Sequence, residues 1–234
     1  MFFQKNAALV AFLLVLSFIL KGQIVSAEKY NEAQYQLIEA ISDTVEVRQY
    51  QPQMVADVTV KGDRSDAAGK GFRQLFAYIS GENLVRQKVP MTVPVAEYPA
   101  DTTNNELPKS ESIKMTTPVT ELNTSDGWVI RFFLPSTYTL DNTPTPKNPH
   151  IKISQTVPRK MAAIRFSGFA GDEKLEKKAA ILIRTLQGTN YDITGSTQYA
   201  FYDSPFTLPF FRRNEVLVPV TRTNDSTPSN HDAD

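Results

Sequence analysis

An internal repeat constrains the fold of this chain more than any other feature. The segment Val45–Gly62 aligns without a gap onto Ile151–Gly168 at a constant offset of 106 residues. Identical residues recur at four aligned positions, namely Gln49 and Gln155, Pro52 and Pro158, Ala56 and Ala162, and Gly62 and Gly168. After one inserted residue the similarity runs on to Gly81 and Gly188. The repeats, about 45–81 and 151–188, predict two similar units packed about a pseudo-twofold axis, with a cleft where they meet.

Each copy of the repeat predicts two strands followed by one helix. In the first copy, Glu46–Gln51 and Met54–Lys61 alternate apolar and polar residues, which is typical of two strands joined by a tight turn. A helix follows, capped by Ser65 or Asp66 and ended by Gly81.

The second copy and the middle of the chain complete the predicted fold. Strands at Ile151–Thr156 and Lys160–Ser167 precede a helix that starts near Asp172 and ends at Gly188. Three more strands are expected, at Gln87–Ala96, Ser112–Glu121 and Trp128–Leu134. Many strands and two helices predict an α+β fold. We expect a distorted antiparallel β-barrel built from two pseudo-twofold-related halves, each contributing one flanking helix.

The two ends of the chain are expected to lie outside this domain. Lys5, the apolar run Ala7–Leu20 and the small residues before Glu28 are typical of a secretory signal peptide covering residues 1–27, cleaved after Ala27. An uncleaved membrane anchor is the alternative, although the apolar run is shorter than the roughly 20 residues of a membrane span. We therefore expect a periplasmic or secreted protein with a single domain at residues 28–220. Residues 221–234 contain few apolar side chains and are expected to be disordered.

Composition argues against several classes of function. Lys and Arg total 25 and Asp and Glu total 25, so no net charge favours nucleic acid or an anionic membrane as a partner. The chain has no cysteine, which excludes disulfides, thiolate metal sites and a cysteine nucleophile. Its two histidines, His150 and His231, have no neighbouring His, Asp or Glu at metal-ligand spacing. A metal site or a histidine-dependent catalytic triad is therefore not expected.

Two short segments have more than one interpretation. Met91–Val95 and Met115–Val119 both read Met-Thr-x-Pro-Val and would lie side by side if their strands paired. Their prolines favour an edge or bulge beside a cavity, but the methionines could also fill gaps in the core. Further on, Phe206–Val216 places aromatic residues next to Arg212 and Arg213. This segment could form a pocket rim with a carboxylate clamp, or core packing with a salt bridge to Glu215.

Several ordered motifs together resemble the SOUL heme-binding protein family. They are the V-E-V-R-Q-Y strand, the two M-T-x-P-V segments, F-F-L-P-S-x-Y at Phe132–Tyr138, R-F-S-G at Arg165–Gly168 and the closing Y-D-S-P…R-R-N-E-V. They span about Tyr35 to Val220 in the order typical of the family. The resemblance implies a distorted antiparallel barrel of two similar halves, in agreement with the repeat.

The resemblance also implies non-covalent binding of heme or a related tetrapyrrole in a shallow apolar site near the first helix. The implied apolar contacts are Phe72, Leu75, Phe76 and Ile79, with Met91 and Met115 nearby. Lys70 or Arg73 would pair with the propionates. Some members have a histidine in the first strand as a plausible axial ligand, but this chain has Gln49 there. The ligand would then bind without strong axial ligation, or through Met91 or Met115, or it is not heme.

Three functional hypotheses follow from these residues. The first is an exported, non-enzymatic tetrapyrrole carrier or buffer. The second is a general binding module for amphipathic small molecules, because duplicated folds of this shape resemble bacterial effector-binding domains of the GyrI-like kind. The third, a hydrolase, is disfavoured because the sequence shows no nucleophile–base pair.

Overall fold

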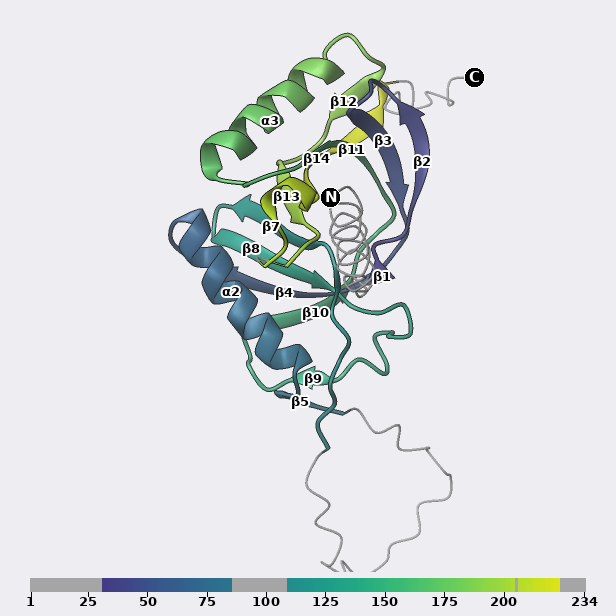
Figure 1. The fold of residues 1–234 in the computed structure, drawn as a ribbon. Helices are drawn as coiled ribbons and strands as arrows, with labels where there is room; N and C mark the ends of the chain where they lie inside the picture. Colours follow the sequence, from purple (N-terminus) through teal and green to yellow (C-terminus); the bar gives the residue numbers. More distant parts are fainter. Residues whose placement is uncertain (1–30, 86–108, 205, 224–234) are drawn as a thin grey trace, which may run out of the picture. The chain divides into compact units, whose positions relative to one another are not determined.

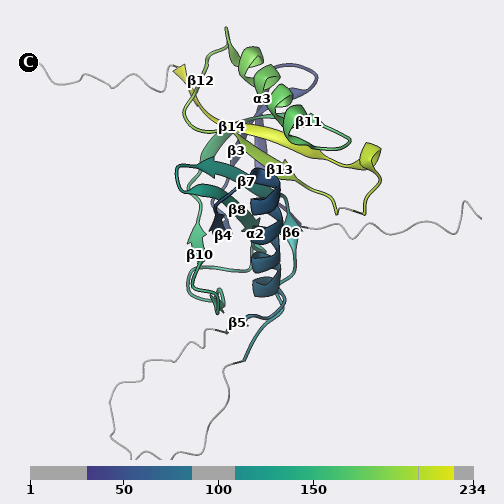
Figure 2. The same cartoon turned by 90° about the vertical axis from the view of Figure 1, so that its left-hand side faces the viewer.

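A curled, mostly antiparallel sheet with two helices on one face forms the folded unit. The computed structural model describes residues 31–85, 109–204 and 206–223, and the chain from Asn31 onward is one unit. Helices α2 (Arg64–Ile79) and α3 (Asp172–Leu186) lie on the same side of the sheet, as Figures 1 and 2 show. The expected α+β fold is confirmed, with a mostly antiparallel, barrel-like sheet that is curled into a half-barrel and flanked by two helices. Within the described ranges, neither helix has the length and apolar character that crossing a membrane requires.

The described strands make one large sheet and two small two-stranded sheets. Their bounds are β1 (Asn31–Glu32), β2 (Tyr35–Ala40), β3 (Val45–Tyr50), β4 (Met54–Val60), β5 (Asn83–Leu84), β6 (Thr116–Thr117), β7 (Val119–Thr124), β8 (Gly127–Phe133), β9 (Thr145–Pro146), β10 (Ile151–Gln155), β11 (Arg159–Phe166), β12 (Tyr191–Ile193), β13 (Gln198–Phe201) and β14 (Asn214–Arg222). The large sheet has the order β10-β4-β8-β7-β13-β14-β11-β3-β2, and β12 pairs with β14. A short 3-10 helix, η1 (Pro209–Phe211), precedes β14.

The two copies of the repeat exchange strands. Strand β3 does not pair with the strand that follows it but with β11 of the second copy, and β4 pairs with β10. In the first pair Val45 lies opposite Ile164, and in the second Ile151 lies opposite Val58. Both registers are related by the same offset of 106 residues. The expected tight turn between β3 and β4 is therefore wrong, because the chain crosses there from one half of the sheet to the other.

The pseudo-twofold axis passes through the centre of the large sheet. Strands β7 and β13 meet there, with Glu121 opposite Tyr199. On either side the same order follows, β8-β4-β10 in one direction and β14-β11-β3 in the other. The order is symmetric about this point, which confirms the two-halves prediction.

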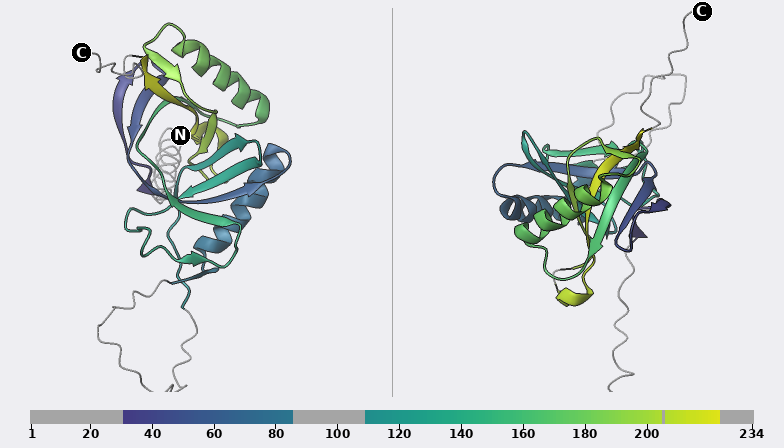
Figure 3. Two further views of the ribbon diagram at one scale, coloured as in Figure 1. Left: turned by 180° about the vertical axis from the view of Figure 1, so that it is seen from behind. Right: turned by 90° about the horizontal axis from the view of Figure 1, so that it is seen from above.

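Separate apolar clusters fill the space beneath each helix. Helix α2 packs on β4 and β8, where Leu75 and Ile79 are buried with Ile130. Helix α3 packs on β11 and β14, where Leu175 and Leu182 are buried. A third cluster lies on the opposite side of the sheet, which we call the inner face. Figure 3 (left) shows the sheet from behind, with both helices on its outer side at the right of the view.

The helix limits differ slightly from the sequence prediction. Helix α2 begins at Arg64 with Asp63 as N-cap, so Ser65 and Asp66 lie inside its first turn. The helix starts early because Gly62 reverses the chain directly after β4 with φ +114°. Gly168, its partner in the repeat, does the same after β11 with φ +93°. This pair therefore marks equivalent strand-to-helix turns.

Other expected limits also need correction. The expected strand Ser112–Glu121 is interrupted at Pro118, and its first part, β6, pairs in parallel with β1. The expected strand Gln87–Ala96, including Met91, lies outside the described residues, as does the signal segment 1–27. Strand β14 continues to Arg222, so the expected domain end at Val220 is two residues short.

Candidate functional site

A stacked aromatic pair lies on one flank of helix α2. Phe72 and Phe76 are four residues apart and therefore share a flank of the helix. Their ring centroids are 5.9 Å apart with an interplanar angle of 10°. The inner ring, Phe72, packs edge-on against Phe132 of the sheet at 5.3 Å, whereas Phe76 remains 48% exposed. The pair forms a flat apolar platform that is anchored in the core and open to solvent.

Two cations lie on the same helix. Lys70 and Arg73 line a cavity of about 380 Å³ along α2, closed on the other side by Asn148 and Ile151. The nearest described carboxylate to Lys70 is Asp66, at 4.0 Å, and both side chains are mostly exposed. The Arg73 guanidinium lies over Gly69, where the helix has no side chain. These cations could orient a carboxylate-bearing ligand on the helix.

The implied site residues separate into three groups. Phe72 and Phe76 form the platform on one flank of α2, and Lys70 lies on the other flank with the cavity. Arg73 is one turn from both groups, because residues three and four apart share a face. Helical spacing therefore brings a cation and an aromatic ring together only at Arg73 and Phe76.

The remaining implied contacts lie below the platform. Leu75 and Ile79 are 0% and 3% exposed, so they support the helix from beneath rather than face solvent. Met115 is partly buried and packs against the same apolar cluster. Nothing is described for Met91.

Gln49 does not lie beside this platform. It sits on β3, between β2 and β11, in the half of the sheet covered by α3. Its side-chain amide donates a hydrogen bond to the backbone carbonyl of Tyr50 at 3.1 Å. The position that the resemblance suggested for an axial ligand is therefore in a different half from α2.

An ion-pair bridge crosses the junction between the halves. Arg64, at the start of α2, donates to Glu121 at 2.7 Å and also pairs with Asp172 at the start of α3. Burial raises the pKa of Glu121, and the charge of Arg64 only partly offsets this effect. On the helix-covered face, the Arg64 side chain thus crosses the junction between the halves.

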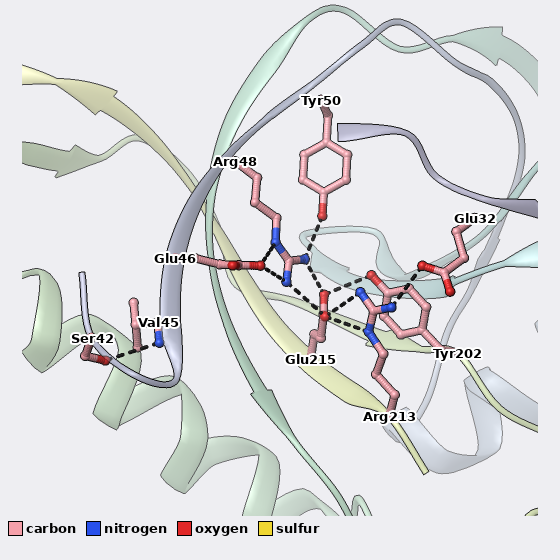
Figure 4. A network of polar contacts seen from close by, with 9 residues as sticks. All are labelled: Glu32, Ser42, Val45, Glu46, Arg48, Tyr50, Tyr202, Arg213 and Glu215. Atoms are coloured by element: carbon pink, nitrogen blue, oxygen red, sulfur yellow. Dashed lines mark hydrogen bonds and ion pairs between the residues drawn. The ribbon is translucent and has the colours of Figure 1, made fainter. Parts of the chain in front are cut away.

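A larger polar network is buried on the inner face (Figure 4). Glu215, which is 0% exposed, accepts hydrogen bonds from Arg48 at 2.6 Å, Arg213 at 2.9 Å and the Tyr202 hydroxyl at 2.8 Å. Arg48 also donates to the Tyr50 hydroxyl at 3.0 Å. Burial by itself would raise the pKa of Glu215, but hydrogen bonding and the charge of Arg48 outweigh burial and lower it. The carboxylate is fully enclosed, so the network holds strands together rather than meeting a ligand.

The Arg-Arg-Asn-Glu motif therefore has a structural role, as one of its two interpretations predicted. Arg213 pairs with Glu215, but the aromatic residues beside it do not enter the core. Phe206, Phe210 and Phe211 are 95%, 63% and 72% exposed. The expectation of core packing is wrong for these rings because they lie on the exposed loop that precedes β14, two of them in η1. Arg212 instead lies over the exposed ring of Phe169, at 5.5 Å.

Sequence reasoning did not identify the inner-face network as a whole. A weak signal was present, because Arg48 and Glu215 are opposite charges within strands whose neighbouring apolar residues alternate. Opposite charges buried on strands usually pair. The two residues are 167 positions apart, and only the fold brings them together. In the part of the chain that the structure describes, no cluster of three or more His, Asp or Glu side chains could hold a metal ion.

The comparison with known families agrees with this geometry. The model of the SOUL heme-binding protein family matches residues 30–219, essentially the whole described domain. The chain belongs to the SOUL heme-binding protein family. Family membership supports a tetrapyrrole-binding role. A search of curated proteins found no match.

Solved structures show remote similarity. The C-terminal domain of EcmrR has a TM-score of 0.48 at 11% identity, covering 80% of this chain and 98% of that one. A hydrolase from Listeria innocua has a TM-score of 0.47 at 12% identity, covering 78% and 94%. SAV2435 bound to tetraphenylphosphonium has a TM-score of 0.38 at 12% identity, covering 80% and 94%. At this distance the similarities carry no conclusion about ligand or chemistry.

Proposed function

We propose that this protein binds heme or a related tetrapyrrole non-covalently along the exposed side of α2, as a carrier or buffer and not as an enzyme. The observation that carries the proposal is the stacked Phe72–Phe76 pair with Arg73 one turn away. A flat apolar ring system stacks on aromatic side chains, and its carboxylates need cations at the edge. Family membership supports the same ligand class.

Different residues of α2 would contact different parts of the ligand. Phe76, with support from Phe72, would contact the face of the macrocycle, and Leu75 would hold the helix against the sheet beneath. Arg73 would pair with one propionate, and Lys70 would attract the second from the neighbouring cavity. When heme is bound, its macrocycle supplies the visible absorption and its iron supplies the redox chemistry of the complex.

The fit is to the macrocycle and its propionates rather than to the iron. Gln49 is in the other half of the sheet, and Met115 is partly buried against the apolar cluster beneath α2. Stacking and charge contacts do not depend on the metal. Metal-free protoporphyrin should therefore bind about as tightly as hemin, and a much weaker affinity for protoporphyrin would require an axial ligand.

The repeat supplies a matched control for the central experiment. Phe76 aligns with Ile183 of α3, and both side chains are partly exposed, at 48% and 39%. Hemin titration should give a saturable Soret change for the unaltered protein and for Ile183→Asp. Phe76→Asp should weaken binding at least tenfold, because it places a negative charge under the macrocycle. Equal loss in both variants, or no saturable change for the unaltered protein, would overturn the proposed site.

The second candidate, an amphipathic-ligand module with a cleft between the halves, has less support. On the helix-covered face Arg64 crosses the junction between the halves, with partners on both sides, and the cavity between the halves on the other face is small. Hemin binding that survives Phe76→Asp but is lost in Arg64→Ala would favour the junction over α2.

We further propose that the protein is exported and that residues 1–27 are removed. The apolar run Ala7–Leu20 followed by small residues before Glu28 supports this proposal. Mass spectrometry of the protein from fractionated cells should find an N-terminus at Glu28 outside the cytoplasmic fraction. An intact N-terminus in the membrane fraction would instead identify an anchor.

A further inference from the structure

The inner face of the sheet carries arginines that differ in their partners. Arg48 and Arg213 pair with Glu215, and Arg131 pairs with Asp57 through two bonds of 2.7 Å each. Each of these three guanidinium groups therefore has a carboxylate beside it. Together they show how the fold neutralises positive charge on this face.

Arg159, at the start of β11, is the exception. Within residues 31–85, 109–204 and 206–223 it makes no ion pair, and its Nε is buried without a hydrogen-bond partner. Burial, followed by the nearby charge of Arg131, lowers the pKa of Arg159. A guanidinium stays protonated even so, and its Nε–H costs free energy because it is buried without a hydrogen-bond partner. An anion supplied from outside would remove that cost.

Arg159 lines a small cavity with several polar groups. The cavity measures about 10 Å³, and its walls include Tyr50, Thr120, Gln198 and Tyr202. This volume holds one water-sized group, such as a single carboxylate oxygen. The cavity thus has room for the head of an anion but not for its body.

A larger cavity of about 410 Å³ adjoins the small one. The two share Ala33 and Phe133 as lining residues, so they lie next to each other at the end of β8. Phe133, Leu134 and Pro135 supply apolar wall, and exposed glutamines lie around it. This volume is in the range of small-ligand pockets. The pair of cavities therefore offers a charged end and a partly apolar body.

We propose that the inner face binds a small carboxylic acid with an apolar body, with its carboxylate against Arg159 and its body in the larger cavity. This site does not depend on the tetrapyrrole site, which lies on the helix-covered face. The carboxylate is favoured over phosphate because the small cavity admits one oxygen, and a carboxylate leaves fewer charged oxygens outside it than phosphate does.

The repeat again suggests the variant to use. Arg159 aligns with Gln53, so the fold already accommodates glutamine at the equivalent position of the first copy. Arg159→Gln removes the charge with little change in size. Arg165→Gln on the same strand is the control, because Arg165 is exposed and lines neither cavity.

Calorimetric titration of the whole protein with benzoate, benzamide and inorganic phosphate tests the proposal. Benzoate should bind saturably to the unaltered protein and to Arg165→Gln, at least tenfold more weakly to Arg159→Gln, and equally well when hemin is already bound. Benzamide and phosphate should bind at least tenfold more weakly than benzoate. Without ligand, Arg159→Gln should unfold at a higher temperature than the unaltered protein, because the buried Nε–H without a hydrogen-bond partner is gone.

Three results would overturn the proposal. They are no binding of benzoate to the unaltered protein, equal binding of benzoate to Arg159→Gln, and equal binding of benzamide. Tight binding of phosphate that is lost in Arg159→Gln would show an oxyanion site in which the apolar cavity has no role. That result would also overturn the proposal. Loss of benzoate binding on adding hemin would place benzoate at α2 instead.

Discussion

Helices α2 and α3 occupy equivalent places in the two halves but present different surfaces. An offset of 107 residues aligns Leu75 with Leu182, and both are fully buried beneath their helices. It also aligns Lys70 with Lys177, and each lysine lies near a carboxylate four residues earlier. The duplication has therefore kept the packing side of the helix and one exposed ion pair.

The solvent side of the two helices has diverged. Where α2 has Phe72 and Arg73, α3 has Ala179 and Ala180. The aromatic platform and its cation therefore exist in one half only. A symmetric frame thus supports one asymmetric site, because core positions tolerate few changes whereas exposed positions tolerate many.

The inner face differs between the halves in the same way. The second half contains the buried carboxylate Glu215 with two arginines, whereas the first half has the half-buried pair Asp57–Arg131. Glu215→Gln should lower the free energy of unfolding by about 3–5 kcal/mol, because it leaves buried guanidinium groups without their counter-charge. Asp57→Asn should cost about 1 kcal/mol, since solvent reaches that pair. Urea unfolding measures both, and equal losses would contradict the difference between the halves.

Acid should act on the same network. The lowered pKa of Glu215 means that its contribution to stability is present above the ordinary value near 4.5 and is lost as the pH falls through the folded pKa. Glu121 at the junction has a raised pKa, so its contribution is lost as the pH rises through the folded value. The free energy of unfolding from pH 7 to pH 3 should therefore fall less steeply in Glu215→Gln than in the unaltered protein. An unchanged slope would show that Glu215 is not the titrating group.

A close approach distinguishes α2 from α3 as well. A Cβ at Gly71 would lie 2.4 Å from Cγ1 of Ile130, whereas the aligned residue of α3 is Lys178. Gly71→Ala should destabilise the protein by about 1–3 kcal/mol through overpacking. Lys178→Ala should cost about 0.5 kcal/mol, the scale of its contact with the Phe166 ring. Thermal unfolding of both variants tests this contrast, and a neutral Gly71→Ala would mean that α2 can shift outward freely.

The smallest expected effect on stability comes from making α3 resemble α2. Ala179→Phe with Ala180→Arg should change the free energy of unfolding by less than about 1 kcal/mol, because Ala180 is exposed and Ala179 is partly so. The double variant should bind a second, weaker equivalent of hemin if a stacked aromatic surface and a cation suffice. Hemin titration gives the stoichiometry, and an unchanged value of one would show that α2 contributes more than these two residues.

The predictability of the fold varied from element to element. Alternation predicted β3, β4, β8, β10 and β11 to within a residue or two, because one face of each strand is buried and the pattern has a period of two. The pairing partners of β3 and β4 were not predictable, since alternation shows which face of a strand is buried but not which strand lies beside it. The start of α2 was misplaced because the turn at Gly62, and not a capping side chain, sets where the helix begins.

The candidate site was also predictable only in part. Spacing placed Phe72, Leu75, Phe76 and Ile79 on a helix, but did not separate the exposed aromatic pair from the buried aliphatic pair. That separation depends on how the helix is rotated against β4 and β8, which contacts between distant residues decide. Gln49 was considered for the site because the sequence does not show which half of the sheet its strand joins.

The sequence by itself determined the duplication, the two strand–strand–helix units and the family, because these depend on local periodicity and on ordered motifs. Only the tertiary structure decided the strand exchange between the copies, the burial of Arg48 with Glu215 and the isolation of Arg159. Each of these depends on residues about a hundred or more positions apart meeting across a sheet. Local sequence determines which face of a strand is buried, and only long-range packing determines which charges meet there.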